Sequence, residues 1–269
     1  MVYIGPAGND VKFYADGNQS SVDAPRWLQS IGLNAYEISF GRGIRMTEKT
    51  AQVIGKQAAD HQVRISVHAP YYINLANPDS IEKNYHYIKR SLCLLHLMGG
   101  NRLVVHVGSQ MQMTRAEALA NCRRALQTVV ERLAADGITD YLLCIETMGK
   151  YTQIGNLEEI CDLCAVDREH IIPTVDFGHL NCLAQGKLDI EDIFARLREF
   201  SAVHYHISFI EYGIKGEIRH LTFAAGEYGF DLAQIMHLIK PRNCDDTVIC
   251  ECAEIMAQDA LKLRDFYLQ

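Results

Sequence analysis

Short apolar runs alternate with longer amphipathic stretches along the whole chain. The runs hold four to six residues, many of them β-branched, and are too short for helices, so each predicts a buried β-strand. They cover residues 2–5, 34–39, 63–68, 103–106, 141–146, 171–176, 203–206 and 247–251. The stretches between them predict helices near 24–31, 47–60, 81–95, 114–133, 189–199, 231–241 and 256–267, with another beginning at Asn156.

Eight strand-helix units in 269 residues predict a single (β/α)₈ TIM barrel domain over residues 1–269. An open doubly wound sheet is the alternative fold. Six of the runs end in a histidine or a carboxylate: His68, His106, Glu146, Asp176, His206 and Glu251. A barrel gathers the carboxyl ends of all its strands on one face, whereas an open sheet concentrates its site at one switch point. The even spread of these residues therefore favours the barrel.

The alternation of side chains along each strand agrees with this fold. The residue just before each polar end would face the helices, since successive side chains point to opposite faces. Five of these six neighbours are apolar or cysteine: Val67, Val105, Ile145, Val175 and Cys250.

The six polar ends are candidate metal ligands. A single histidine at a strand end is more often a core or loop residue, and a single glutamate often caps the next helix. Several carboxylates in one small volume repel one another unless they are protonated or bind a cation. Imidazole and carboxylate groups are ligands for zinc and related divalent metals, so the repeated pattern predicts a metal centre. His204 is assigned to the barrel core, one layer deeper than His206.

Composition limits the possible partners. The formal net charge of −7 argues against nucleic acid, which normally selects a basic surface, although bound dications would reverse the charge at the site. No apolar run reaches the roughly 20 residues of a membrane helix, and the start of the chain lacks the features of a signal peptide. We expect a cytoplasmic protein without a membrane partner. The nine cysteines, Cys161 and Cys164 included, are expected to be buried thiols.

The motifs together resemble the endonuclease IV family of apurinic/apyrimidinic endonucleases. The resemblance rests on Tyr3-Ile-Gly5, His68-Ala-Pro-Tyr-Tyr-Ile-Asn-Leu75, His106-Val-Gly-Ser109, Ile145-Glu-Thr147, Val175-Asp-Phe-Gly-His179 and Tyr205-His-Ile-Ser208, in the family's order. It implies a metal-assisted phosphodiester hydrolase that cleaves DNA 5′ to abasic sites in base excision repair. It also implies three zinc ions at the mouth of the barrel, with Mn²⁺ as another metal that these ligands accept.

The resemblance assigns ligands to three sites and makes Glu146 and Glu251 the catalytic carboxylates. The first zinc would take His68, His106 and Glu146; the second Glu146, Asp176, His206 and Glu251; the third His179, His220 and a carboxylate. The family has that carboxylate two residues before the last histidine, where this chain has Ile218. Glu217 is the expected substitute and Glu211 a more distant candidate, so two to three ions are predicted.

The resemblance also points to residues that contact DNA. Tyr71 and Tyr72 follow the first histidine ligand, and their rings would fill the gap at a damaged base. The other interpretation is that both tyrosines pack on their loop. Arg42 and Arg45, after the second strand, are candidates for binding phosphate or wedging into the duplex, or are solvated charges. The expected partner is duplex DNA with abasic sites, bound by a monomer.

Two other functions compete with this one. A sugar isomerase or epimerase resembling xylose isomerase would use the ring Glu146, Asp176, His206 and Glu251 around a single divalent metal. The further imidazoles of His68, His106, His179 and His220 favour a multinuclear site instead. A catalytically silent DNA-binding module is the third possibility, and it leaves a complete ligand set without a role.

Overall fold

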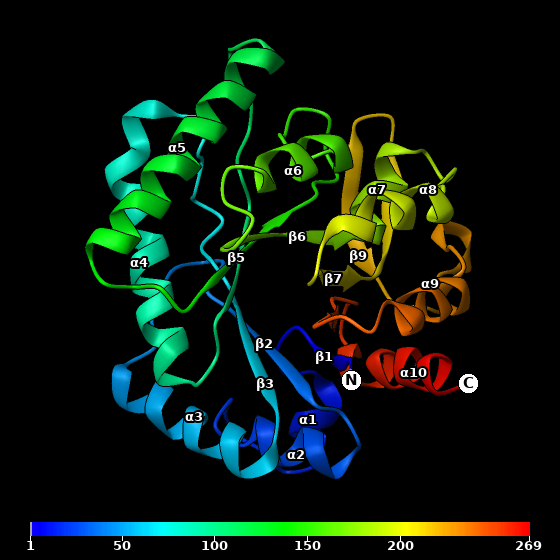
Figure 1. The fold of residues 1–269 in the computed structure, drawn as a ribbon. Coiled ribbons are helices and arrows are strands. Elements are labelled where there is room, and N and C mark those ends of the chain that lie inside the picture. Colours follow the sequence, from blue (N-terminus) through cyan, green and yellow to red (C-terminus); the bar gives the residue numbers. More distant parts are fainter. Residues whose placement is uncertain (1) are drawn as a thin grey trace.

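The computed structural model describes residues 2–269 and shows eight parallel strands wound into a barrel with helices around it (Figure 1). The strand order around the barrel is β1-β10-β7-β6-β5-β4-β3-β2. The strands are β1 (Tyr3–Pro6), β2 (Ala35–Ser39), β3 (Arg64–His68), β4 (Arg102–Val105), β5 (Leu142–Glu146), β6 (Ile171–Asp176), β7 (His204–Ile207) and β10 (Thr247–Cys250). The predicted single-domain (β/α)₈ barrel is confirmed, with the fourth and eighth strands each ending one residue before the predicted ligand.

The barrel closes between β1 and β2, the first and last strands in this order. The backbone N–H of Asn34 donates to the carbonyl of Ile4 at 3.1 Å, and the N–H of Ile4 donates to Asn34 Oδ1 at 2.7 Å. Gly5 makes this approach possible, because a Cβ there would lie 1.7 Å from the carbonyl oxygen of Ala35.

Ten helices connect the strands and form the outer layer among residues 2–269. They are α1 (Val11–Ala15), α2 (Ala24–Ser30), α3 (Glu48–His61), α4 (Ile81–Leu97), α5 (Arg115–Ala135), α6 (Leu157–Cys164), α7 (Phe177–Leu183), α8 (Ile190–Arg196), α9 (Leu232–Ile239) and α10 (Met256–Leu268). Thr114 and Glu117 form the capping box of α5, and Asn156 and Glu159 form that of α6. No helix in the described part of the chain is long and apolar enough to cross a membrane.

Three structured segments were missing from the sequence prediction, the first of them the short helix α1. Helix α7 follows β6 without a loop, and β8 (Phe209–Gly213) pairs with β9 (Gly216–Leu221) in an antiparallel hairpin after β7. Single-turn 3₁₀ helices, also not predicted separately, occur at η1 (Pro78–Ser80), η2 (Leu197–Glu199), η3 (Gly226–Tyr228) and η4 (Lys240–Arg242).

The two faces of the strands pack differently. The outward residues named above, such as Val67 and Ile145, belong to the large core between the strands and the helices. Inside the barrel, Val104 and Cys144 belong to a small apolar cluster. Much of the interior is instead polar and charged, and it opens at the carboxyl ends of the strands.

Candidate metal centre

The predicted ligands converge at the carboxyl ends of the strands and form three adjoining clusters. Cluster 1 is His68, His106 and Glu146; cluster 2 is Glu146, Asp176, His206 and Glu251; cluster 3 is His179, Glu217 and His220. Within each cluster, one nitrogen or oxygen of every residue lies within 4.8 Å of the others. This division is the one implied by the endonuclease IV resemblance, and the ligand roles themselves stay a prediction.

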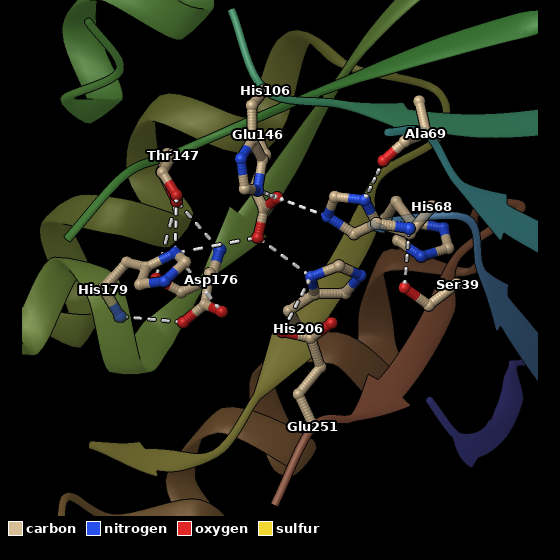
Figure 2. A network of polar contacts seen from close by, with 12 residues as sticks. Ser39, His68, Ala69, His106, Glu146, Thr147, Asp176, His179, His206 and Glu251 are labelled. Atoms are coloured by element: carbon tan, nitrogen blue, oxygen red, sulfur yellow. Dashed lines mark hydrogen bonds and ion pairs between the residues drawn. The ribbon is translucent and has the colours of Figure 1, made fainter. Parts of the chain in front are cut away.

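Glu146, the last residue of β5, lies between clusters 1 and 2 (Figure 2). Its Oε2 is 2.8 Å from His106 Nε2 and 3.2 Å from His68 Nε2. Its Oε1 is 3.0 Å from His206 Nδ1. The two oxygens of one buried carboxylate therefore face two different groups of imidazoles.

Two of the histidines are oriented by backbone carbonyl groups. His68 Nδ1 donates to the carbonyl of Ala69 at 2.9 Å, and His179 Nδ1 donates to the carbonyl of Thr147 at 2.9 Å. A carbonyl oxygen only accepts, so Nδ1 carries the proton in both rings. Nε2 is then the nitrogen that each ring turns toward its cluster, His68 toward Glu146 and His179 toward Glu217.

Asp176 connects the end of β6 to α7. Its Oδ1 caps the helix by accepting the N–H of His179 at 2.7 Å. Its Oδ2 is buried and has no hydrogen-bond partner among residues 2–269. Burial raises the pKa of Asp176, and the negative charge of Glu146 raises it further against the opposing effect of His179. A buried carboxylate oxygen without a donor is a position where a cation fits.

The imidazoles also change the protonation of the site. Burial favours the neutral form of Glu146, but His106 and His206 outweigh it and hold its pKa well below the usual range. Burial lowers the pKa of His68, but the Glu146 carboxylate outweighs this and raises it to about 9. Without a metal, protons on the imidazoles balance the negative charge of the carboxylates. A bound metal requires deprotonated ligands, so the donor set fits dications that replace those protons.

A β-bulge places the carboxylate of cluster 3. The pairing of β8 with β9 shifts between Glu211 and Tyr212, which leaves Ile218 as an extra residue in β9. In a regular strand, Glu217 and His220 would face opposite sides, whereas one extra residue between them brings both to the same side. Both side chains line the cleft above the barrel, and Ile218 is 58% exposed. The bulge thus accounts for an isoleucine at the family's carboxylate position.

Glu211, the more distant candidate for this position, takes no part in the clusters. Its Oε2 lies 2.6 Å from Arg219 Nε on the neighbouring strand of the hairpin. The ion pair is on the outer part of the hairpin, where Arg219 is 70% exposed. Of the two carboxylates considered for cluster 3, the structure brings only Glu217 to the histidines.

Comparison with known proteins identifies the family. The family model of the xylose isomerase-like TIM barrel matches residues 25–265. The chain belongs to this family. The uncharacterized protein MJ0133 of Methanocaldococcus jannaschii is 29% identical, over 99% of this chain and 97% of its own. The probable endonuclease 4 of Mycoplasma genitalium is 30% identical over 61% of this chain and 59% of its own, and it supports the predicted endonuclease IV-like relationship.

Solved structures show how widely this family's fold is shared. A D-tagatose 3-epimerase-like protein superposes with a TM-score of 0.72, covering 90% of this chain and 91% of its own. At 19% identity this likeness shows the fold alone. The fold alone therefore does not identify the reaction, which depends on the residues of the site.

The predicted DNA-binding residues of this family member fall in two places. Arg42 and Arg45 line a hollow of about 910 Å³, and Tyr71 lines both this hollow and the cleft of the clusters. The Tyr71 ring stacks on His106, with centroids 5.2 Å apart and planes at 17°. Tyr72 lies apart, 6.2 Å from the ring of Tyr87 on α4. The two neighbouring tyrosines thus have different surroundings.

The cleft over the clusters, about 370 Å³, contains residues that sequence reasoning missed. Lys150 and Gln153 line it from the segment after β5, and Lys150 Nζ is 4.0 Å from Glu217 Oε2. The segment is held close to cluster 3, since a Cβ on Gly149 would lie 2.8 Å from the His179 ring. Its position shortly after the strand end at Glu146 was the only hint in the sequence, and no residue pattern marked Lys150.

A fourth group, also missed, lies below cluster 2 inside the barrel. It consists of Glu37, His204 and His206, all buried. His204 was assigned to the core, and its side chain is indeed fully buried. Glu37 was not singled out, because it stands inside a strand rather than at its end.

Proposed function

We propose that the chain is a metal-dependent phosphodiester hydrolase of the endonuclease IV type, which cleaves duplex DNA 5′ to abasic sites with two to three zinc ions. The observation that carries the proposal is the junction of three ligand clusters, two of them sharing Glu146. A site for one ion needs neither this shared carboxylate nor the separate group on the β8–β9 hairpin. Neighbouring dications are a recurrent arrangement in enzymes that hydrolyse phosphate esters.

The chain's own residues would each have a defined part in this reaction. Bound dications supply Lewis acidity and lower the pKa of water. Glu251 is 16% exposed while Asp176 is fully buried, so Glu251 rather than Asp176 would accept a proton from entering water. Glu146 keeps clusters 1 and 2 at a fixed separation, and the carbonyl-bound rings of His68 and His179 hold their ligand nitrogens in place.

The charge around the mouth fits a nucleic-acid substrate despite the net charge of −7. Arg42 and Arg45 line the hollow beside the clusters, and Lys150 lines the cleft itself. These cations would bind the phosphates that flank the cleaved bond. Tyr71, between hollow and cleft, would contact the sugar or base at the lesion.

A second candidate is a sugar isomerase or epimerase with one divalent metal. It is favoured by cluster 2, which offers three carboxylates and one imidazole by itself, and by the fold shared with a D-tagatose 3-epimerase-like protein. It gives no role to cluster 3 or to the pairing of His68 and His106 on Glu146.

Metal content and substrate assays together test the proposal. Protein prepared without chelator is expected to contain two to three ions per chain, mainly zinc, by mass spectrometry. It should cleave a duplex with a single abasic site and leave the undamaged duplex intact. A single Mn²⁺ or Mg²⁺ per chain, together with interconversion of ketohexoses and no cleavage, would establish the second candidate instead.

A further inference from the structure

Glu37 is a buried carboxylate that the proposed hydrolysis does not use. It lies in β2 with 1% of its surface exposed and points into the barrel below cluster 2. Its Oε2 accepts the hydroxyl of Ser66 at 2.7 Å and lies 3.0 Å from His204 Nε2. Its Oε1 lies 3.0 Å from His206 Nε2. A charge buried this deeply destabilises the fold unless it is paired and hydrogen-bonded.

Both ring nitrogens of His206 face carboxylates. Nδ1 faces the ligand cluster, 3.0 Å from Glu146 Oε1 and 3.4 Å from Glu251 Oε2. Nε2 faces away from the cluster, toward Glu37 Oε1. The ring is fully buried, so solvent cannot replace either contact.

His206 therefore differs from the other oriented histidines of the centre. His68 and His179 turn their second nitrogen to a backbone carbonyl, which is neutral. His206 turns its second nitrogen to a carboxylate, which accepts a hydrogen bond more strongly and makes the opposite nitrogen a better donor to a metal.

We propose that Glu37 is the positioning residue of His206: it holds the ring with the proton on Nε2 and Nδ1 toward cluster 2, and so raises the metal affinity of that cluster. The inference rests on the proposed metal centre but not on the substrate. Ser66 and His204 both contact Oε2, which keeps the carboxylate in place and leaves Oε1 for His206.

The contact between His206 and Glu37 is close but not straight. Nε2 and Oε1 are 3.0 Å apart, yet neither has an aligned hydrogen-bond partner in the described part of the chain. A metal bound at Nδ1 would leave the ring proton on Nε2, the nitrogen that lies 3.0 Å from Glu37 Oε1. The competing interpretation is that Glu37, His204 and His206 themselves hold an ion. The number of bound ions in a Glu37 variant distinguishes this ion site from a positioning role.

Two substitutions separate the charge of Glu37 from its hydrogen bond. Glu37→Gln keeps an oxygen acceptor without the charge, and Glu37→Met removes both. Zinc affinity is measured by competition with a chromophoric chelator, and the number of ions at saturation by mass spectrometry. We expect the tightest zinc to bind about 10-fold more weakly in Glu37→Gln and about 100-fold more weakly in Glu37→Met.

Controls make each outcome decisive. Glu159→Gln removes another buried carboxylate, paired with Arg115 at 2.7 Å and outside the clusters, and should leave zinc affinity unchanged. Unchanged affinity in both Glu37 variants would overturn the inference, while absence of bound metal in the wild type would overturn the metal centre itself. Loss of one whole ion at saturating zinc in Glu37→Gln would show that the inner group is a metal site and overturn the positioning role.

A measurement on the wild type covers the case in which the variants fail to fold. In the zinc-loaded protein, ¹⁵N spectra of the histidine side chains should show a proton on Nε2 of His206 that exchanges slowly with solvent. An unprotonated Nε2, or a proton on Nδ1, would contradict the inference without any substitution.

Discussion

Replacing Glu146 with glutamine tests whether one carboxylate serves two ions. Glutamine has nearly the same shape, but one of its two terminal atoms becomes an NH₂ group that cannot bind a metal. Since Oε2 faces His68 and His106 while Oε1 faces His206, the substitution removes one oxygen ligand and the negative charge from the junction of clusters 1 and 2. Both clusters should therefore lose affinity together.

The size of the effect follows from the number of ions involved. Loss of a group that only orients a ligand weakens metal binding about 10- to 100-fold, so loss of a shared ligand should cost at least about 100-fold per ion. That is about 2.8 kcal/mol for each ion and about 5.6 kcal/mol for two. At saturating metal the difference appears in stability, and at roughly 2 to 4 °C per kcal/mol it lowers Tm by about 10 to 20 °C.

Calorimetry of four samples provides the assay: wild type and Glu146→Gln, each zinc-saturated and metal-free. Glu146 also pairs with buried histidines when no metal is bound, so the quantity compared is the gain in Tm on zinc binding. This gain should be smaller in Glu146→Gln by the amount above. Cleavage of abasic duplex should fall by at least about a hundredfold, because Lewis-acid stabilisation by one ion is worth several kcal/mol. If the variant lost a single ion, or kept its zinc-dependent gain in Tm, the shared role of Glu146 would be refuted.

Five further substitutions examine the surroundings of the centre. Glu217→Gln should remove one ion, counted by mass spectrometry. Ile218→Asp should leave the number of ions unchanged, because the bulge turns residue 218 outward. A higher zinc affinity in Ile218→Asp would contradict the bulge argument. Tyr72→Ala should weaken binding to abasic duplex by about 1 to 3 kcal/mol if its ring stacks on DNA, and leave hydrolysis of a small phosphodiester unchanged. Tyr71→Ala should reduce both activities, because Tyr71 stacks on His106. Equal losses from the two substitutions would refute this distinction between the tyrosines. Lys150→Met should raise the KM for duplex and flatten its salt dependence while metal content stays constant, and an unchanged salt dependence would exclude a phosphate contact.

The barrel and most of the candidate ligands could be predicted because their signals are local. Apolar runs of strand length mark each strand, and the carboxyl ends of parallel strands meet on one face of a barrel. His68, Glu146 and Asp176 each stand at the last position of their strand, so their meeting follows from the topology alone.

Other features depend on contacts between distant segments and left no such signal. The bulge at Ile218 arises from the pairing of β9 with β8, and a single sequence does not reveal that register. Glu37 resembles an ordinary strand residue until the barrel places it beside His204 and His206, 167 and 169 positions further along the chain. The surroundings of Tyr71 and Tyr72 differ for a similar reason, since the first ring stacks on His106 and the second lies near Tyr87 of α4.

The distribution of carboxylates suggests how one fold accommodates both one-ion and multi-ion chemistry. Cluster 2 has three carboxylates and lies directly above Glu37, so it gathers the most negative charge and would hold its ion most tightly. Cluster 1 adds two imidazoles around an oxygen of Glu146 that cluster 2 already positions. Cluster 3 has one carboxylate, with the ammonium of Lys150 4.0 Å away. A multi-ion centre can therefore be built on a one-ion site by adding imidazoles and a hairpin, with the barrel itself unchanged.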